Sequence, residues 1–505
     1  MMAATRQAPA LPLSSLLASE VAMPAEVDPL VTGMTADSRQ VEKGWIFAAC
    51  RGAAVHGLDY LPDALTAGAA AILWEPEDAV DAAQAETLVR AAGVPLVAVP
   101  ELSRKLGLLA SRLHREPSAD LTVIGVTGTD GKTSVTQFIA QALAAEGQLC
   151  GLIGTLGYGL HGRLTPGANT TPDAARVQAL LAGFRDSGAD FASMEVSSHA
   201  LDQHRVAGVR FRIAVLTNLG RDHLDYHLTE QAYAAAKRRL FESEGLACAV
   251  LNLDDAFGCS MRDILAPGVL PLGYSASSDS GAEITVRTLE MMPEGLKVAV
   301  NTPVGMVAAE VPVMGHFNAQ NLLAATAVLV ALGWDAPRIS RALAAIRPVS
   351  GRMECFGGGE RPLVVVDYAH TAGALKAALQ ALREHVSGRI WCVFGCGGDR
   401  DSGKRPLMAA VAEANADHLI ITDDNPRRED PDRIIADIKV GLRRQTALVE
   451  RDRAAAIGCA IGAAGAGDAV LVAGKGHENY QVTADGVHHY SDRETVIHLL
   501  EEARP

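Results

Sequence analysis

Residues 121–139, LTVIGVTGTDGKTSVTQFI, decide the fold of the region around them. The apolar run from Leu121 to Val126 is typical of a strand that is buried on both faces of a parallel sheet. Glycines and polar residues follow from Gly128 to Thr133, and apolar residues then recur at helical spacing from Val135 to Leu143. The stretch therefore predicts a strand, a tight loop and an amphipathic helix.

The loop has the composition of a phosphate-binding turn. Gly128 and Gly131 let backbone N–H groups approach phosphate oxygens, and the N-terminus of the helix adds its dipole. Lys132 would neutralise phosphate charge, and the hydroxyl of Thr133 is placed to bind Mg²⁺. The strict phosphate-loop pattern has a glycine where this chain has Val126, so a generic glycine-rich turn is the alternative. A lysine and a hydroxyl residue directly after the last glycine favour ATP binding.

Strand-like runs alternate with helical patterns along the rest of the chain, which predicts an α/β protein of three domains, with a parallel sheet in the centre. We place the domains at residues 1–105, 106–348 and 349–505, with a polar linker at Arg115 to Asp120. The central domain should end after a helix holding Ile339 to Ile346. The expected strands are Ala70 to Trp74, Leu96 to Val99, Phe191 to Val196, Phe211 to Leu216, Ala247 to Leu251, Leu363 to Val366, Ile390 to Phe394, Leu419 to Thr422 and Val470 to Ala473. Ligands are expected at their carboxyl ends.

Composition excludes several classes of protein. Apolar residues make up 49% of the 505 residues and charged residues 21%, which is typical of a globular chain that buries cores. The formal net charge of -14 disfavours nucleic acid and anionic membranes as partners, so an anionic ligand would need a locally cationic or metal-containing pocket. The 8 cysteines show no zinc-binding spacing and are expected to be reduced thiols. With no secretory leader pattern and no long apolar run, we expect a cytoplasmic protein.

Carboxylates, imidazoles and a lysine gather in the centre of the chain. Glu195 ends an apolar strand, where a metal ion is a sensible counter-charge for a buried anion. Residues 217–227, TNLGRDHLDYH, place acids and histidines in the turn after another strand. These residues could form only a capping and ion-pair cluster, but the phosphate loop favours a Mg²⁺ site. Lys237, beside two arginines, reads from its pattern alone as a solvated helical lysine.

The segment TGTDGKT at residues 127–133 resembles the ATP loop of the Mur ligases and of the related folylpolyglutamate synthetases, where TGTNGKT is usual and Asp130 here replaces the asparagine. Further blocks from Asp37 to Asp492 follow the Mur ligase pattern in order. They are DSR at 37–39, NTTP at 169–172, EVSSH at 195–199, QHR at 203–205, GHFNAQN at 315–321, GRME at 351–354 and DYAH at 367–370. The usual proline after this last block is Ala372 here, and the loop from Arg51 to His56 departs from the family, so no contacts are assigned there.

The resemblance implies the following roles. ATP would contact Gly128, Thr129, Asp130, Gly131, Lys132, Thr133, Ser134, Asn318, Asn321, Arg352 and Asp367. A uridine-linked muramyl dipeptide would contact Ser38, Asn169, Thr170, Thr171, Ser197, Gln203 and Arg205. Two Mg²⁺ ions would be held by Thr133, Glu195, His223 and Lys237, the lysine as a carbamate formed with CO₂. The catalytic residues would be Lys132, Glu195, His223 and Lys237.

The motif DNPR at residues 424–427 follows an expected strand, where a sheet of this kind binds ligand. It could be an ordinary Asn-Pro turn with an exposed arginine. It also resembles the signature of Mur ligases that add meso-diaminopimelate, whose extra carboxylate a guanidinium matches with two hydrogen bonds. On this interpretation the acceptor contacts are Arg400, Asp424, Asn425, Pro426, Arg427, Gly474 and Glu478. The glycines at 395, 397 and 398 do not form a dinucleotide fingerprint.

The resemblance thus implies an ATP-dependent ligase of peptidoglycan precursor synthesis. It would join meso-diaminopimelate to the D-Glu side-chain carboxylate of UDP-MurNAc-L-Ala-D-Glu through an acyl phosphate, in a chain of an N-terminal UDP-binding domain, a central ATPase domain and a C-terminal Rossmann-like domain. We expect a monomer with small-molecule substrates only. The alternatives are a lysine-adding relative, a folylpolyglutamate-type ligase, and a non-enzymatic switch that uses the phosphate loop.

Overall fold

The computed structural model describes residues 10–18, 20–21, 27–52, 55–76, 83–444 and 447–502. It divides into two compact units: residues 1–275, 279–284 and 324–334 form the first, and residues 276–278, 285–323 and 335–505 form the second. Each unit is described by itself. Two residues of the Arg51 to His56 loop, 53 and 54, lie outside the described residues.

The first unit begins with a small four-stranded parallel sheet in the order β3-β4-β5-β6. Its strands are β3 (Gly33–Thr35), β4 (Trp45–Ala49), β5 (Ala71–Trp74) and β6 (Leu96–Ala98), and its helices are α1 (Leu13–Leu17), α2 (Leu61–Thr66), α3 (Ala83–Ala92) and α4 (Leu102–Leu113); β1 (Leu11–Pro12) and β2 (Leu30–Val31) pair separately. Apolar side chains of α1 and α4 cover one face and those of α2 and α3 the other. Both predicted strands of this region are confirmed. The boundary expected after residue 105 falls inside α4.

The segment expected to be a linker is packed in place. Pro117 and Ser118 are buried in a 3₁₀ turn (Pro117–Ala119), and the Ser118 hydroxyl accepts a hydrogen bond from the backbone N–H of Arg210 at 3.0 Å. The chain therefore enters the next sheet on a fixed path.

A larger sheet of the first unit has the strand order β10-β9-β8-β11-β7-β12-β13-β14. These strands are β7 (Thr122–Thr127), β8 (Cys150–Gly154), β9 (Gly157–Leu160), β10 (Arg163–Thr165), β11 (Phe191–Glu195), β12 (Ile213–Leu216), β13 (Cys248–Asn252) and β14 (Leu270–Ser275). All but β9 and β10 are parallel. The predicted strand after residue 121 is confirmed as β7, which lies between β11 and β12, so the phosphate loop leaves the middle of the sheet.

Helices cover this sheet and carry the polar motifs that follow its strands. They are α5 (Lys132–Ala145), α6 (Ala174–Asp186), α7 (Ser198–Asp202), α8 (Leu224–His227), α9 (Glu230–Arg238) and α10 (Ala256–Arg262). Helix α6 also contributes Ala174 and Ala175 to the core formed by α1 and α4. The segment that carries Asn169 to Thr171 is thereby tied to the small N-terminal sheet.

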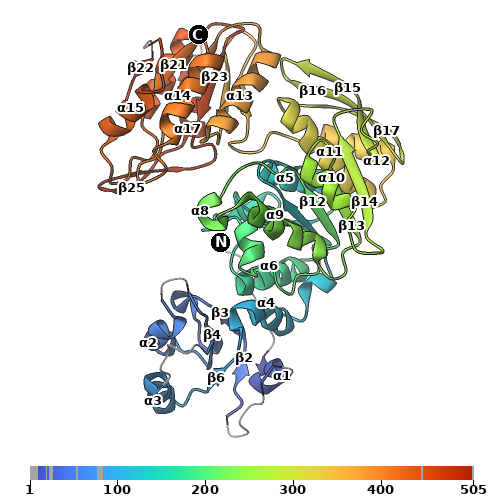
Figure 1. Cartoon of the computed structure of the whole chain (residues 1–505), viewed down its shortest axis with the longest axis vertical. Coiled ribbons are helices and arrows are strands. Elements are labelled where there is room, and N and C mark those ends of the chain that lie inside the picture. The colour runs from blue at the N-terminus through green and yellow to red at the C-terminus, as the bar shows by residue number, and fades with distance from the viewer. Residues whose placement is uncertain are drawn as a thin grey trace. The chain divides into compact units, whose positions relative to one another are not determined.

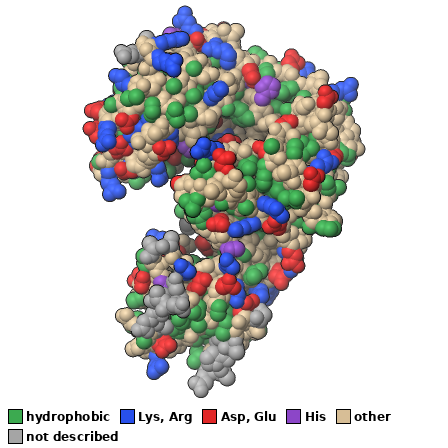
Figure 2. All heavy atoms as spheres, viewed as in Figure 1, with side chains coloured by type: hydrophobic (Ala, Val, Ile, Leu, Met, Phe, Trp, Pro, Cys, Tyr) green, Lys and Arg blue, Asp and Glu red, His purple; other side chains and the backbone are tan. Residues whose placement is uncertain are grey.

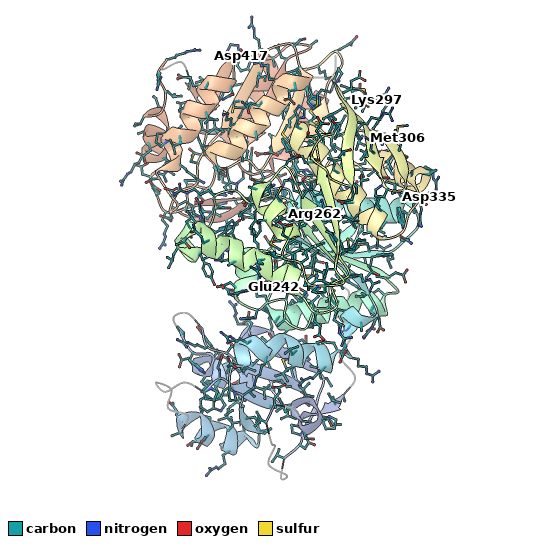
Figure 3. The ribbon with its side chains drawn as sticks, turned by 45° about the vertical axis from the view of Figure 1, so that its right-hand side comes forward. Glu242, Arg262, Lys297, Met306, Asp335 and Asp417 are labelled. Atoms are coloured by element: carbon teal, nitrogen blue, oxygen red, sulfur yellow. The ribbon has the colours of Figure 1, made fainter. Side chains whose placement is uncertain are left out.

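The second unit holds three antiparallel strands that the sequence patterns did not suggest: β15 (Ile284–Met292), β16 (Gly295–Thr302) and β17 (Gly305–Val311). Buried and more exposed residues alternate along most of β16 and β17, and the charged residues Lys297 and Glu310 lie at exposed positions. Lys297 of β16 pairs with Glu310 of β17 at 3.3 Å, and Met306 is exposed on β17 (Figure 3). Helix α11 spans His316–Ala331, and α12 (Ala336–Ala344) begins at Asp335, whose carboxylate caps its N-terminus.

A six-stranded sheet in the order β18-β19-β23-β20-β21-β22 completes this unit. Its strands are β18 (Glu354–Gly357), β19 (Leu363–Asp367), β20 (Ile390–Phe394), β21 (His418–Ile421), β22 (Leu448–Val449) and β23 (Ala469–Ala473), with a separate hairpin of β24 (Tyr480–Thr483) and β25 (Gly486–His489). Residues of α13 (Ala372–His385), α14 (Lys404–Asn415) and α15 (Pro431–Lys439) cover one face, and those of α16 (Arg453–Ala463) and α17 (Asp492–Glu502) the other (Figure 1). The expected parallel strands of this third of the chain are confirmed, and only β18 at the edge is antiparallel.

Surface and thiol chemistry agree with the expectations from composition. Acidic and basic side chains are interspersed over the visible face in Figure 2. All eight cysteines are free thiols, and Cys150, Cys248, Cys392 and Cys396 are buried. Within the described part of the chain, the helices are too short or too polar to cross a membrane.

Candidate active site

The loop between β7 and α5 is held by a second loop that follows β12. Gly128 and Gly131 both have positive φ, of 151° and 82°. The Thr217 hydroxyl donates to the carbonyl oxygen of Asp130 at 2.6 Å, and the Asn218 side chain accepts from the N–H of Asp130 at 2.9 Å. A Cβ on Gly128 would lie 1.8 Å from the Thr217 oxygen. The loop is therefore preshaped, and only glycine fits at its first turn.

Two lysines point at the same carbonyl of this loop. Lys132 Nζ donates to the carbonyl oxygens of Gly128 at 3.0 Å and Thr129 at 2.9 Å. Lys237 Nζ, from α9, donates to the same Gly128 oxygen at 2.6 Å. The sequence predicted Lys132 at this position from the loop motif. Lys237 could be placed here only through the family resemblance.

Lys237 lies in surroundings that favour its neutral form. Its side chain is 1% exposed, and its amino group lies 4.3 Å from the centre of the Tyr233 ring. Burial, together with the positive charge of Lys132, lowers the pKa of Lys237 well below its ordinary value. A neutral amine is the form that reacts with CO₂, so this environment suits the expected carbamate.

Glu195 is fixed at the carboxyl end of β11, next to the phosphate loop. It is 2% exposed and accepts hydrogen bonds from the Thr133 hydroxyl at 3.0 Å, the Thr155 N–H at 2.8 Å and the Thr155 hydroxyl at 3.1 Å. A Cβ on Gly154 would lie 2.3 Å from its Oε1. Three neutral hydrogen-bond donors thus take the place of water around this carboxylate, and two of them are hydroxyls that can rotate.

His223 belongs to an aromatic cluster beside this loop. Its ring centre lies 4.8 Å from that of His199 and 6.1 Å from that of Tyr233. The Tyr233 hydroxyl is 3.1 Å from the Thr129 hydroxyl, which links the cluster to the phosphate loop. The side chain of His223 is 45% exposed and carries one ring nitrogen 3.4 Å from the Asp222 carboxylate.

The expected metal ligands fit a magnesium site in their chemistry. Thr133 and Glu195 are in contact, and Lys237 lies at the same loop. No group of three or more His, Cys, Asp or Glu side chains among the described residues could hold a metal ion. The hydroxyl of Thr133, the carboxylate of Glu195 and a carbamate on Lys237 would all offer the oxygen ligands that hard cations prefer.

The residues expected to hold the muramyl donor form one connected network beside Glu195. Arg205 donates to the Thr171 carbonyl at 3.0 Å and to the Gln203 side chain at 3.0 and 2.6 Å. Thr171 donates to the carbonyl of Glu195 at 2.8 Å, and the N–H of Ser197 donates to Thr171 at 3.2 Å.

Three further residues that are expected to bind the muramyl dipeptide have defined positions. The Thr170 hydroxyl lies 3.1 Å from that of Thr155, and the Asn169 backbone bonds the Tyr158 hydroxyl. Ser38 is buried in the turn after β3, in the small N-terminal sheet. The Ser197 hydroxyl caps helix α7, which is a structural use that the sequence pattern did not reveal.

The remaining expected ATP residues, Asn318, Asn321, Arg352 and Asp367, lie in the second unit, although the first two were expected in the central domain. Asn318 and Asn321 are buried on α11, where the Asn321 side chain donates to Asn318 at 3.0 Å and Asn318 donates to the Met314 carbonyl at 2.9 Å. The two amide side chains therefore lie on the same face of α11.

Arg352 and Asp367 lie together at the end of β19. The Arg352 guanidinium is 4.5 Å from the centre of the Tyr368 ring, and its buried Nε has no hydrogen-bond partner. Asp367 accepts from the N–H groups of Met353 and Ala369, each at 2.8 Å. Burial raises the pKa of Asp367, against the opposing effects of Arg352 and of these N–H groups.

The two expected acceptor arginines flank one glycine. A Cβ on Gly397 would lie 2.9 Å from Nη1 of Arg427 and 3.7 Å from Cγ of Arg400. Arg427, which has a φ of 55°, donates through Nη1 to the Gly398 carbonyl at 2.8 Å. Arg400 is exposed. The loops after β20 and β21 therefore bring both arginine side chains to Gly397, at the carboxyl edge of this sheet.

The remaining acceptor residues surround a buried lysine. Lys475 is 0% exposed, and its Nζ donates to Asn425 at 2.9 Å and to Asp424 and Glu478, both at 3.4 Å. Asn425 also donates to Glu478 at 3.0 Å. Gly474 has a φ of 120° and approaches the Asp424 carboxylate, with 3.6 Å from its ideal Cβ to Oδ2. Lys475 thus holds the carboxylates of Asp424 and Glu478, which come from different loops, beside one ammonium group.

Comparisons with known proteins agree with this geometry. Three Mur ligase profiles match: the family's catalytic domain at residues 30–114, its middle domain at 126–329 and its glutamate ligase domain at 351–476. The UDP-N-acetylmuramoyl-L-alanyl-D-glutamate--2,6-diaminopimelate ligase of Alkalilimnicola ehrlichii is 54% identical over 473 residues, covering 94% of this chain and 95% of that protein. The chain belongs to the Mur ligase family.

Two further similar proteins carry the same name as this relative. The Pseudomonas aeruginosa relative is 48% identical over 480 residues, covering 94% of this Mur ligase and 96% of that protein. A solved structure described as this ligase aligns with a TM-score of 0.71 at 37% identity, covering 98% of this chain and 99% of that one. As a Mur ligase, the chain is an ATP-dependent ligase with the three-domain α/β fold of the family.

Sequence reasoning missed several residues that build the site of this Mur ligase. Thr155, Thr217 and Tyr233 fix Glu195 and the phosphate loop, and Lys475 fixes the acceptor residues. Their type and spacing carried no signal, because polar residues become informative only when they are buried. Lys475 directly follows Gly474 and precedes Glu478, both expected acceptor residues, and the structure shows that it is fully buried.

Proposed function

We propose that this Mur ligase adds meso-diaminopimelate to the D-Glu side-chain carboxylate of UDP-MurNAc-L-Ala-D-Glu, with hydrolysis of ATP to ADP and phosphate, in peptidoglycan precursor synthesis. The observation that carries this choice of acceptor is that the side chains of Arg400 and Arg427 both lie against Gly397. The names of its most similar relatives support the same assignment.

ATP enters the reaction as the phosphoryl donor. Backbone N–H groups of residues 128–133 and the N-terminus of α5 would bind its phosphates. Lys132, which now donates to loop carbonyls, needs only to turn its ammonium group toward the phosphate to neutralise it. Asn318, Asn321, Arg352 and Asp367 would bind the rest of the nucleotide.

Transfer of the terminal phosphoryl group to the donor carboxylate would give an acyl phosphate. The acceptor amine attacks its carbonyl carbon, the C–N bond forms, and phosphate leaves with the electrons of the C–O bond. Both steps bring negatively charged groups together, so fixed positive charge is the main contribution the protein can make. Closure of the site around the acyl phosphate would exclude water.

Magnesium would supply that charge, by polarising phosphoryl oxygens when it is bound. Thr133, Glu195, His223 and Lys237 as its carbamate would hold two such ions. Glu195 is positioned by its three hydrogen bonds, and the depressed pKa of Lys237 keeps its amine reactive toward CO₂. The carbamate would turn a buried amine into an anionic oxygen ligand.

The donor would bind along the network of Thr170, Thr171, Ser197, Gln203 and Arg205, with Asn169 beside it and Ser38 at the uridine end.

We propose domain boundaries of 1–105, 106–348 and 349–505, with uridine binding, ATP chemistry and acceptor binding in that order. The enzyme would work as a monomer in the cytoplasm, where ATP is available, and each expected group comes from one chain.

Acceptor binding would rest on charge matching. Diaminopimelate has a second amino acid carboxylate that lysine lacks, and a guanidinium can bind it with two parallel hydrogen bonds. Asp424 and Glu478, aligned by Lys475, would bind the amino group beside that carboxylate. An acceptor without the distal carboxylate would leave Arg427 unpaired, which is the source of selection.

An acceptor panel tests the proposal. The purified enzyme, with ATP, Mg²⁺ and UDP-MurNAc-L-Ala-D-Glu, should incorporate meso-diaminopimelate at least about tenfold more efficiently in kcat/KM than L-lysine. Preference for lysine would indicate the lysine-adding alternative. Glutamate addition to a folate would indicate the folylpolyglutamate-type ligase, and ATP turnover that no acceptor changes would indicate the switch.

A further inference from the structure

Arg405, in the first turn of α14, is a buried cation that none of the roles above uses. Its side chain is 1% exposed. Nη1 and Nη2 donate to the two carboxylate oxygens of Glu429, each at 2.7 Å, and Nη1 also donates to Asp437 at 2.8 Å. Nη2 reaches the carbonyl oxygen of Gly397 at 3.2 Å. A single guanidinium therefore joins α14, α15 and the loops after β20 and β21.

The two loops that Arg405 joins are the loops of the acceptor arginines. Gly397, whose carbonyl it binds, is the residue against which the side chains of Arg400 and Arg427 both lie. Glu429, whose carboxylate it binds, follows Arg427 by two residues and also accepts from the N–H of Asp399 at 3.1 Å. Arg405 itself lies behind these loops, out of reach of solvent.

Gly398 shows how close Glu429 is to the acceptor arginines. A Cβ on Gly398 would lie 3.0 Å from Cβ of Glu429, and the Gly398 carbonyl accepts from Arg427 at 2.8 Å. Glu429 and Arg427 thus both contact Gly398, and a carboxylate two residues from Arg427 is a competitor for its guanidinium, because it could form the same two-hydrogen-bond pair that the acceptor carboxylate needs. In the structure, its oxygens are directed to Arg405 instead.

We propose that Arg405 is a positioning residue for acceptor selection: by holding the Glu429 carboxylate in a two-hydrogen-bond pair, it keeps that internal anion away from Arg400 and Arg427 and leaves them available to the acceptor carboxylate. This inference rests on the proposed function, because it takes the two arginines as the acceptor clamp. The bond to Gly397 adds a second effect, since it sets the spacing of the clamp.

A double-mutant experiment separates this role from a merely structural one. Arg405→Gln should raise the KM for meso-diaminopimelate at least about tenfold, because a released Glu429 pairs with the clamp. The KM for ATP should stay within about twofold, as ATP is bound by other residues. Removal of the competitor in Arg405→Gln/Glu429→Gln should restore the acceptor KM to within about threefold of the value for Glu429→Gln alone.

Two further variants keep the test decisive even if Arg405→Gln does not fold. Glu429→Gln alone should leave the acceptor KM within about threefold of wild type, because a neutral amide cannot compete as an anion. Asp437→Asn removes the negative charge of the α15 partner of the same guanidinium and leaves Glu429 unchanged, so its acceptor KM should also match wild type.

The outcomes divide cleanly. A double variant as poor as Arg405→Gln, or a tenfold rise in acceptor KM for Glu429→Gln alone, would overturn the inference and leave the proposed function intact. A wild-type enzyme that never incorporates meso-diaminopimelate would overturn the proposed function and this inference with it. Rescue by the second substitution would establish that the charge of Glu429, and not a disordered loop, impairs the single variant.

Discussion

Lys132 and Lys237 donate to one and the same oxygen, the carbonyl of Gly128, at 3.0 and 2.6 Å. Two ammonium groups this close repel each other, so one of them is favoured as the neutral amine. The buried one is Lys237, whose pKa is lowered well below its ordinary value. The loop that binds phosphate therefore also selects which lysine can react with CO₂.

Lys237→Ala should reduce turnover at least about a hundredfold, because an anionic ligand near the transferred phosphoryl group is lost. A short carboxylate added to the buffer should partly restore the rate in a steady-state phosphate-release assay. Arg238→Ala is the matched control, since Arg238 is exposed on the same helix and pairs with Glu242 at 2.8 Å. A normal rate for Lys237→Ala would remove the carbamate from the account.

Gly128→Ala should lower ATP turnover at least about tenfold and destabilise the fold by about 1–3 kcal/mol. The added Cβ would lie 1.8 Å from the Thr217 oxygen at a φ of 151°, so the loop must shift. ATP binding by calorimetry and thermal unfolding measure the two effects. Gly183→Ala is the control, because this helical position has no atom within 4 Å of a new Cβ and should gain about 0.5–1 kcal/mol. Equal behaviour of the two variants would contradict the preshaped loop.

Arg427→Ala should lose meso-diaminopimelate incorporation at least about tenfold while the affinity for ATP stays nearly unchanged. The neighbouring Arg428 is 90% exposed and is the natural comparison, so Arg428→Ala should behave as wild type. Kinetics with meso-diaminopimelate and with L-lysine distinguish selection from general damage. An equal loss with both acceptors would show that Arg427 is not the selecting residue.

The pair of Arg405 and Glu429 also predicts a pH dependence of stability. Its hydrogen bonds to Arg405 lower the pKa of Glu429 from 4.5 to about 2. A carboxylate whose pKa is depressed in the folded state stabilises the fold fully above its unfolded value and loses this contribution as the pH falls toward the folded value. The difference in unfolding free energy between wild type and Glu429→Gln should therefore be constant above about pH 5 and shrink between pH 4.5 and 2. Denaturant titrations across this range measure it, and a difference that grows on acidification would refute the pairing.

The sequence predicted those parts of the site whose structure depends on residues close together in the chain. The run from Leu121 to Thr133 specifies its own strand, loop and helix start, because burial on both faces and glycine at positive φ leave little choice. The parallel strands of the last third were predicted for the same reason. The antiparallel strands β15 to β17 were not, since exposed residues interrupt their apolar residues and the partner strands are unknown from sequence.

Residues joined across long separations could not be predicted from spacing. Thr133 meets Glu195 because β7 and β11 are neighbours in the sheet, and the resemblance to the family, not periodicity, suggested that pair. Arg405 and Lys475 gave no sign at all of being fully buried. A charged residue in a polar motif normally faces solvent, and only the packed structure shows that these two do not.

Phosphoryl transfer to the donor carboxylate is the step on which the whole account depends, and isotope transfer tests it directly. UDP-MurNAc-L-Ala-D-Glu labelled with oxygen-18 in the D-Glu side-chain carboxylate is incubated with the enzyme, ATP, Mg²⁺ and meso-diaminopimelate, and the released phosphate is analysed by mass spectrometry. The account predicts one labelled oxygen in phosphate for each amide bond formed. Phosphate without the label, while the tripeptide product accumulates, would contradict it.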